Sequence, residues 1–164
     1  MDVRSVQRPL KERYRNEPGA ARITLRARGS ETTDAAACSV DIGRAVYEAQ
    51  AHAGVGGEGT AACSGDLLLG ALAACAQVTC QMVAAASGIP TERIEVEAEG
   101  TLDLRGTLGI DREAPVGFGQ VSLRFDIDAP QASQEQLESL LEKTERYCVV
   151  LQTLRKPPAI ELVS

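Results

Sequence analysis

Ser-Gly-Asp-Leu-Leu-Leu-Gly-Ala-Leu-Ala-Ala-Cys, residues 64–75, opens the stretch that decides the fold. Ser64 can cap a helix at this point, and Asp66 falls in the first turn, where a carboxylate interacts favourably with the helix dipole. Apart from one glycine, nothing breaks the helix until Gly88-Ile89-Pro90 supplies a stop. The pattern predicts a helix over residues 67–87, about 22 residues and about 33 Å long. It is apolar nearly all round, which is typical of a helix buried in a core.

Segments on both sides of this helix alternate apolar and polar residues, which is the period of half-buried strands. Gly43-Arg44 lies between two such segments and predicts a hairpin with a two-residue turn. The expected strands cover residues 21–27, 37–42, 45–51, 93–104 and 120–127, with a last edge strand at 159–163. The glycine-rich connection at residues 52–63 is expected to be extended or mobile.

Two further helices are expected. Residues 6–16 can form a short helix that ends before Pro18. Ser133 and Gln136 fit a capping box, and the apolar residues that follow recur at helical spacing through Cys148 to Leu151, until Pro157-Pro158 closes the segment.

The strands come in consecutive runs joined by short turns. We therefore expect an α+β fold, with antiparallel or mixed sheets around a long buried central helix. A chain of 164 residues has the size of one domain, so residues 1–164 are expected to form a single domain, with residues 1–18 as an N-terminal extension.

Composition excludes several functions. The net charge of −6 and the absence of a basic patch argue against nucleic-acid binding. The longest apolar or small run, residues 67–76, falls short of the roughly 20 residues that span a bilayer. The first 16 residues lack the apolar core of a secretory signal, so we expect a cytoplasmic protein that does not enter membranes. Aromatic residues make up only 3%, so small aliphatic side chains must fill the core, and a subunit interface would add burial.

The chain has five cysteines, namely Cys38, Cys63, Cys75, Cys80 and Cys148. An odd number without a signal peptide argues against a disulfide framework, and a single histidine without Cys-x-x-Cys makes a zinc site a weak interpretation. Free cysteines are among the most often buried residues, so Cys38, Cys63 and Cys80 are interpreted as packing. His52 is interpreted as a loop residue rather than a catalytic base.

Cys75 and Cys148 pose a sharper question, because each is expected in a helix among apolar neighbours. If the fold brings the two thiols together, they form either a redox couple or part of the core. Cys75 lies too deep in its own helix for that helix's N-terminus to lower its pKa much, so a reactive Cys75 would need a nearby cation. The candidates are Arg22, Arg26, Arg28 and Arg44.

Two motifs resemble the OsmC/Ohr superfamily over roughly residues 35–163. Residues 64–75 are similar to that family's Pro-x-Glu-Leu-Leu-x-Ala-Ala-x-x-x-Cys, and the helix runs on to Ser-Gly-Ile-Pro at 87–90, followed by an alternating strand. Glu-Arg-Tyr-Cys-Val-Val at 145–150 is similar to the family's second cysteine motif. Gly65 stands where one branch of the family has a glutamate, and Val149-Val150-Leu151 lacks the proline and serine that follow the family's second cysteine.

The resemblance implies an intertwined homodimer with a reactive site at the subunit interface. It implies reduction of organic hydroperoxides, with Cys75 as the peroxidatic cysteine and Cys148 as the resolving one. An external dithiol would regenerate the thiols, and no metal, haem or flavin cofactor is expected. Two alternatives stay open. The chain could be a non-enzymatic dimer that binds a hydrophobic small molecule in the interface cavity, or all five cysteines could be packing.

Overall fold

The structure is a computed structural model that describes residues 3–24, 28–31, 37–41 and 45–163. Residue contacts divide the chain into two compact units that interleave along the sequence. The first unit contains residues 1–12, 70–98 and 123–164, and the second contains residues 13–69 and 99–122. The single domain expected from the sequence stays a prediction.

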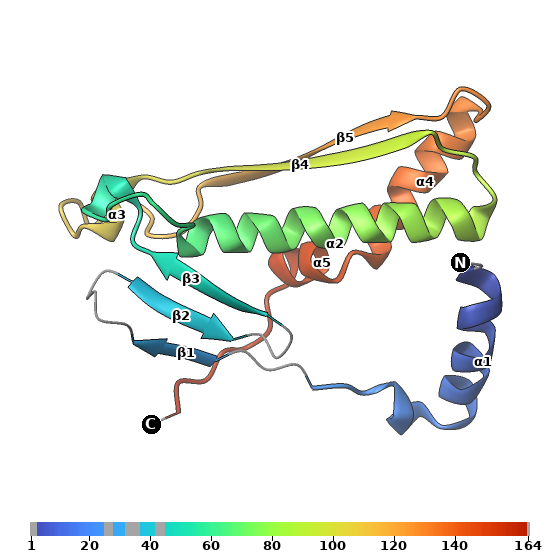
Figure 1. Cartoon of the computed structure of the whole chain (residues 1–164), viewed down its shortest axis with the longest axis horizontal. Coiled ribbons are helices and arrows are strands. Elements are labelled where there is room, and N and C mark those ends of the chain that lie inside the picture. Colours follow the sequence, from blue (N-terminus) through green and yellow to red (C-terminus); the bar gives the residue numbers. More distant parts are fainter. Residues whose placement is uncertain (1–2, 25–27, 32–36, 42–44, 164) are drawn as a thin grey trace. The chain divides into compact units, whose positions relative to one another are not determined.

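The second unit contains a three-stranded antiparallel sheet in the order β1 (Arg28–Glu31), β2 (Ala37–Asp41) and β3 (Val46–Gln50) (Figure 1). Asp41 pairs with Val46 and Ala37 pairs with Gln50, which confirms the hairpin predicted from residues 37–51. The turn residues Gly43 and Arg44 lie outside the described residues.

The strand expected at residues 21–27 is wrong over its described part. Pro18–Ala21 forms a short 3₁₀ helix (η1), residues 22–24 have no regular structure, and residues 25–27 lie outside the described residues. Proline fixes φ near the value of a helical turn, and the Arg22 N–H then donates to the Gly19 carbonyl oxygen. Ile23 is 77% exposed, so its alternating neighbours meet no buried surface that would favour a strand.

The glycine-rich connection is folded rather than extended. It contains a 3₁₀ turn, η2 (Ala53–Val55), and the N–H of Gln50 donates to the carbonyl oxygen of Ala62, 3.0 Å away, which closes the loop. A Cβ at Gly57 would lie 1.7 Å from the Ala51 carbonyl oxygen, so this close approach requires glycine.

Helix α2 (Ser64–Ser87) begins at the residue that was expected to be its N-cap. The Leu67 N–H donates to the Cys63 carbonyl oxygen, and the Cys63 N–H donates to the carboxylate of Asp66 at 2.9 Å. The N-cap expected at Ser64 is therefore wrong by one residue, because Cys63 precedes the helix and Asp66 reaches back to it.

The predicted end of α2 is confirmed. Gly88 has φ +70°, the left-handed conformation that glycine adopts without strain. The N–H of Ile89 donates to the carbonyl oxygen of Ala84 (3.0 Å), and that of Gly88 donates to Ala85 (3.3 Å). These two bonds form a Schellman motif.

The single chain buries α2 along one stripe only, composed of Leu72, Ala76, Cys80 and Ala84. Val78, on another face, is 53% exposed. Among the described residues α2 is the one helix whose length and apolar composition would allow it to cross a membrane, a test that core helices also pass. The buried stripe is that of a core helix.

Strands β4 (Arg93–Thr101) and β5 (Gln120–Asp128) form a two-stranded sheet, as predicted (Figure 1). β4 ends three residues early, because Asp103 caps the short helix α3 (Leu104–Thr107) by accepting from the Arg105 N–H. In the first unit the pair runs antiparallel, with the Glu92 N–H donating to Asp128. Ile94 of β4 and Phe125 and Ile127 of β5 pack on a buried cluster. The cluster consists of Cys80, Ala84, Ile89 and Leu140.

Helix α4 (Gln134–Tyr147) begins with the predicted capping box, since Ser133 and Gln136 exchange hydrogen bonds of 2.9 and 3.2 Å. The helix does not continue through Cys148, which has φ −72° and ψ 106° and separates α4 from α5 (Val149–Arg155). Across the break, the Gln152 side chain donates to the Glu145 carbonyl oxygen at 2.8 Å.

Helix α1 (Val3–Asn16) is present, and it begins three residues before its predicted start. The edge strand expected at residues 159–163 is not formed. Leu162 is 99% exposed, so within this chain the segment has no sheet to join.

Candidate functional site

Cys75 and Cys148 lie together in the first unit, where α2 meets the start of α5. The Cys148 thiol is a hydrogen-bond partner of the Cys75 sulfur. The Cys75 sulfur also accepts from the backbone N–H groups of Val149 and Val150, in the first turn of α5, and from the Thr79 hydroxyl one turn further along α2. Four donors therefore surround this sulfur.

Cys148 occupies the junction between α4 and α5 and has no exposed surface, whereas Cys75 is partly exposed. Cys148 makes no conventional side-chain cap to α5, but the N–H groups of Leu151 and Val150 lie near its sulfur. The pair thus combines one accessible thiol with one enclosed thiol.

The two pKa values move in opposite directions. Burial, the largest influence on Cys75, raises its pKa, but the donors together outweigh it and the pKa falls below that of an ordinary thiol. Burial also raises the pKa of Cys148, and the neighbouring Cys75 raises it further. The surroundings therefore favour the thiolate on Cys75 over the thiolate on Cys148.

The cation expected beside Cys75 is not among the described groups that lower its pKa. Arg22 is exposed and belongs to the second unit, while Arg26 and Arg44 lie outside the described residues, as does the side chain of Arg28. The described donors to Cys75 in the first unit are uncharged, and the expected arginine stays a prediction. A helix N-terminus does act on Cys75, but it belongs to α5 rather than to α2.

The remaining cysteines fit the packing interpretation where they are described. Cys80 is fully buried in the core cluster, hydrogen-bonded to Thr144, and burial raises its pKa. Cys63 is partly exposed, and its thiol contacts the Asp66 carboxylate. The side chain of Cys38, on β2, is not described.

His52 has a local structural contact. Its Nδ1 accepts from the Gly54 N–H at 3.0 Å, which caps η2. This is the loop role that the sequence predicted.

Sequence reasoning missed the donors to Cys75. Thr79 lies four residues after Cys75, on the same face of the helix. This spacing could have predicted that the Thr79 hydroxyl donates to the Cys75 sulfur. The amides of Val149 and Val150 carried no such signal, because their role depends on the break at Cys148.

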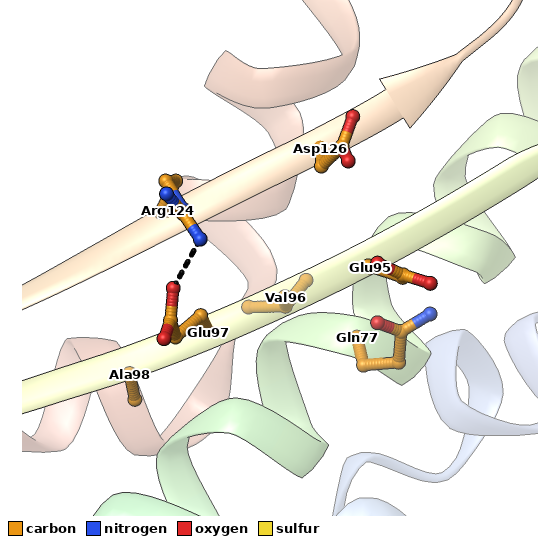
Figure 2. Close-up of a pocket in the computed structure, with 7 residues that line it drawn as sticks. All are labelled: Gln77, Glu95, Val96, Glu97, Ala98, Arg124 and Asp126. Atoms are coloured by element: carbon orange, nitrogen blue, oxygen red, sulfur yellow. Dashed lines mark ion pairs between the residues drawn. The ribbon is translucent and has the colours of Figure 1, made fainter.

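A separate groove lies along β4, beside α2 (Figure 2). It has a volume of about 640 Å³ and is lined by Gln77, Glu95, Val96, Glu97, Ala98, Arg124 and Asp126. Its charges already pair with one another or with a neighbour: Arg124 contacts Glu97 at 2.5 Å, and Arg93 contacts Asp126 at 2.8 Å. Among the described residues, no cluster of three metal-ligating side chains exists here or elsewhere.

The comparisons with known proteins agree on one fold. A family model described as "OsmC-like protein" matches residues 57–163, and no curated protein matches the chain. An OsmC-like protein from Mycoplasma pneumoniae superimposes with a TM-score of 0.68 at 15% identity, covering 82% of this chain and 89% of that one. An organic hydroperoxide resistance protein from Elizabethkingia anophelis, with thiocyanate bound, gives 0.63 at 23% identity, covering 84% and 91%.

A third solved structure is similar. An organic hydroperoxide resistance protein OsmC from Legionella pneumophila gives a TM-score of 0.61 at 20% identity, covering 83% of this chain and 92% of that one. At these identities the likeness to solved structures shows the fold.

Proposed function

The chain belongs to the OsmC-like protein family, and from this premise we propose that it is a thiol-dependent peroxidase that reduces organic hydroperoxides through Cys75 and Cys148. The observation that carries the proposal is the contact between the two thiols, with the thiolate favoured on Cys75. The similar structures of organic hydroperoxide resistance proteins from Elizabethkingia anophelis and Legionella pneumophila support the substrate class.

The reaction needs two electrons from the thiol pair. The Cys75 thiolate attacks the terminal oxygen of R–O–OH, an S–O bond forms, the O–O bond breaks, and the alkoxide leaves to become an alcohol. The Cys148 sulfur then attacks the sulfenic acid on Cys75, so that a disulfide forms and water is released. An external dithiol reduces the disulfide by exchange and is itself oxidised.

The described geometry suits these steps. Cys75 is partly exposed, so a peroxide can reach its sulfur, whereas Cys148 is enclosed and protected from other oxidants. Four hydrogen-bond donors stabilise the thiolate. Since these described donors are uncharged, we expect neutral organic hydroperoxides to be preferred.

We further propose that the protein is an intertwined homodimer in the cytoplasm. Val78 on α2 and Val149 on α5 are 53% and 71% exposed, and both lie within three residues of a candidate catalytic cysteine. A second copy that covers these side chains would place the thiol pair at the interface. A reducing cytoplasm would keep the pair ready to react.

The test is the consumption of cumene or tert-butyl hydroperoxide in the presence of a dithiol such as dihydrolipoamide. We expect Cys75→Ser to abolish consumption, because it removes the nucleophile. Cys63→Ser, which changes a partly exposed thiol outside the pair, should leave the rate unchanged. A wild-type protein that consumes neither peroxide with any dithiol would overturn the proposal.

The other candidate, a dimer that binds a hydrophobic molecule without catalysis, has less support. The groove along β4 is lined mainly by charged side chains and suits an apolar ligand poorly, and the cavity that this candidate requires would lie between two copies of the chain. Tight binding of an apolar fluorescent probe by a protein that consumes no peroxide would favour this candidate.

A further inference from the structure

We propose that Cys148 has a second catalytic role, as the general acid that protonates the departing alkoxide before its sulfur resolves the sulfenic acid. This inference rests on the proposed function and adds a step to it. The observations that carry it are the contact between the two sulfurs, the complete burial of Cys148 and the kinds of donor that surround Cys75.

The first step of peroxide reduction requires a proton. An alkoxide is strongly basic, so its departure is faster when an acid positioned at the reacting centre donates a proton to it. The oxygen that leaves is bonded to the oxygen that the Cys75 sulfur attacks. The acid must therefore lie near that sulfur to reach the leaving oxygen.

The described donors to Cys75 differ in what they can give. The backbone N–H groups of Val149 and Val150 stabilise charge but do not release protons at neutral pH. The Thr79 hydroxyl is a far weaker acid than a thiol. Of the described donors, Cys148 is the one that can both contact Cys75 and release a proton.

The surroundings of Cys148 keep that proton in place until it is needed. The side chain has no exposed surface, and burial in this junction disfavours its thiolate. The negative sulfur of Cys75 disfavours it further. These surroundings therefore favour a negative charge on Cys75 and a proton on Cys148.

The two roles follow one another without an additional base. The Cys75 thiolate takes the terminal oxygen of R–O–OH, and the alkoxide takes the proton of Cys148 and leaves as ROH. Cys148 is now the thiolate that must attack the sulfenic sulfur. The S–S bond forms, the S–O bond breaks, and hydroxide leaves and takes a proton from solvent to become water.

The experiment measures the first oxidation of Cys75 in single turnover, without reductant, in the wild type, Cys148→Ser and Cys148→Ala. We expect Cys148→Ala to slow release of tert-butanol from tert-butyl hydroperoxide by at least tenfold. Cys148→Ser keeps a hydroxyl donor at this position and should fall between the other two. Circular dichroism and thermal melting establish that each variant is folded.

Two measurements distinguish a Cys148 that acts as a general acid from a Cys148 that only attacks the sulfenic acid. With a peroxy acid, whose carboxylate leaves without protonation, the deficit of Cys148→Ala should nearly vanish. The wild-type rate should rise with pH as Cys75 ionises and fall at higher pH as Cys148 loses its proton, and the falling limb should be absent in Cys148→Ala.

The inference fails if all three proteins form the Cys75 sulfenic acid from tert-butyl hydroperoxide at the same rate, or if the deficit is equal for both oxidants. The proposed function would survive that result, because Cys148 could still act as the resolving cysteine. If neither oxidant oxidises Cys75 in the wild type, the proposed function itself fails. The two failures are therefore distinguishable.

Discussion

At the scale of single residues, the thiolate of Cys75 depends on hydrogen bonds that can be removed one at a time. The Thr79 hydroxyl is one of the donors that lower the pKa of Cys75. Thr79→Val keeps the shape of the side chain but removes this donor, so we expect the pKa of Cys75 to rise. Alkylation of Cys75 by iodoacetamide at pH 7 should slow by roughly fivefold or more, the cost of losing a hydrogen bond to a charged group.

The control for this prediction is Thr79→Ser, which restores the hydroxyl and should restore the alkylation rate. The rate is followed across pH by mass spectrometry of the peptide that contains Cys75, so that the other thiols do not interfere. Equal profiles for Thr79→Val and the wild type would show that this hydroxyl does not influence the sulfur.

The sequence predicted which residues belong to the candidate site but not what activates them. Cys75 and Cys148 were named from two motifs, and the structure places their sulfurs in contact. The described donors to Cys75 are uncharged, and two of the four are backbone amides, which the sequence did not predict. Every residue except proline has a backbone N–H, so the sequence does not show which of these groups will donate to a thiol. That depends on where a helix begins.

At the scale of elements, the start of α2 depends on Asp66. Its carboxylate accepts from the Cys63 N–H, and this bond lowers the pKa of Asp66. Asp66→Ala should therefore lower the free energy of unfolding at pH 7 by about 1 kcal/mol, as is usual for a lost helix cap. Urea unfolding followed by circular dichroism gives the measurement.

The same bond gives a pH dependence with a definite sign. Because the pKa of Asp66 is lower in the folded state, its contribution is complete above the ordinary carboxyl value of about 4 and is lost as the pH falls through the folded value. The difference between the wild type and Asp66→Ala should shrink below about pH 4. Asp66→Asn, which keeps an acceptor without charge, should show a smaller and nearly pH-independent loss.

Element boundaries were predictable where one residue decides them. The capping box at Ser133 and the stop at Gly88 are confirmed, since each relies on local geometry that a short motif encodes. The break at Cys148 was not predicted, because its apolar neighbours continue the helical spacing through the junction. The break separates α4 from α5, so the first backbone N–H groups of α5 are free to donate to the Cys75 sulfur.

At the scale of the whole molecule, the α+β fold follows from the order of strands and helices, and the comparisons confirm it. The segments at residues 22–24 and 159–163 alternate like strands but have no regular structure in this chain. A strand needs a neighbour with free backbone groups, and an alternating pattern does not say whether the chain itself supplies one. The same reasoning applies to α2, which is apolar on more faces than its own chain buries.

The last prediction concerns those uncovered faces. Val78 is 53% exposed on α2, so a second copy that covers it would gain apolar burial, and a charge there would oppose association. We expect Val78→Glu to weaken the dimer at least a hundredfold, measured by sedimentation equilibrium over a dilution series. Val116→Glu introduces the same charge at a site that is 66% exposed, on the connection before β5, and should leave the dimer intact. A wild type that sediments as a monomer at every concentration would contradict the proposed homodimer, and a fully dimeric Val78→Glu would remove α2 from its interface.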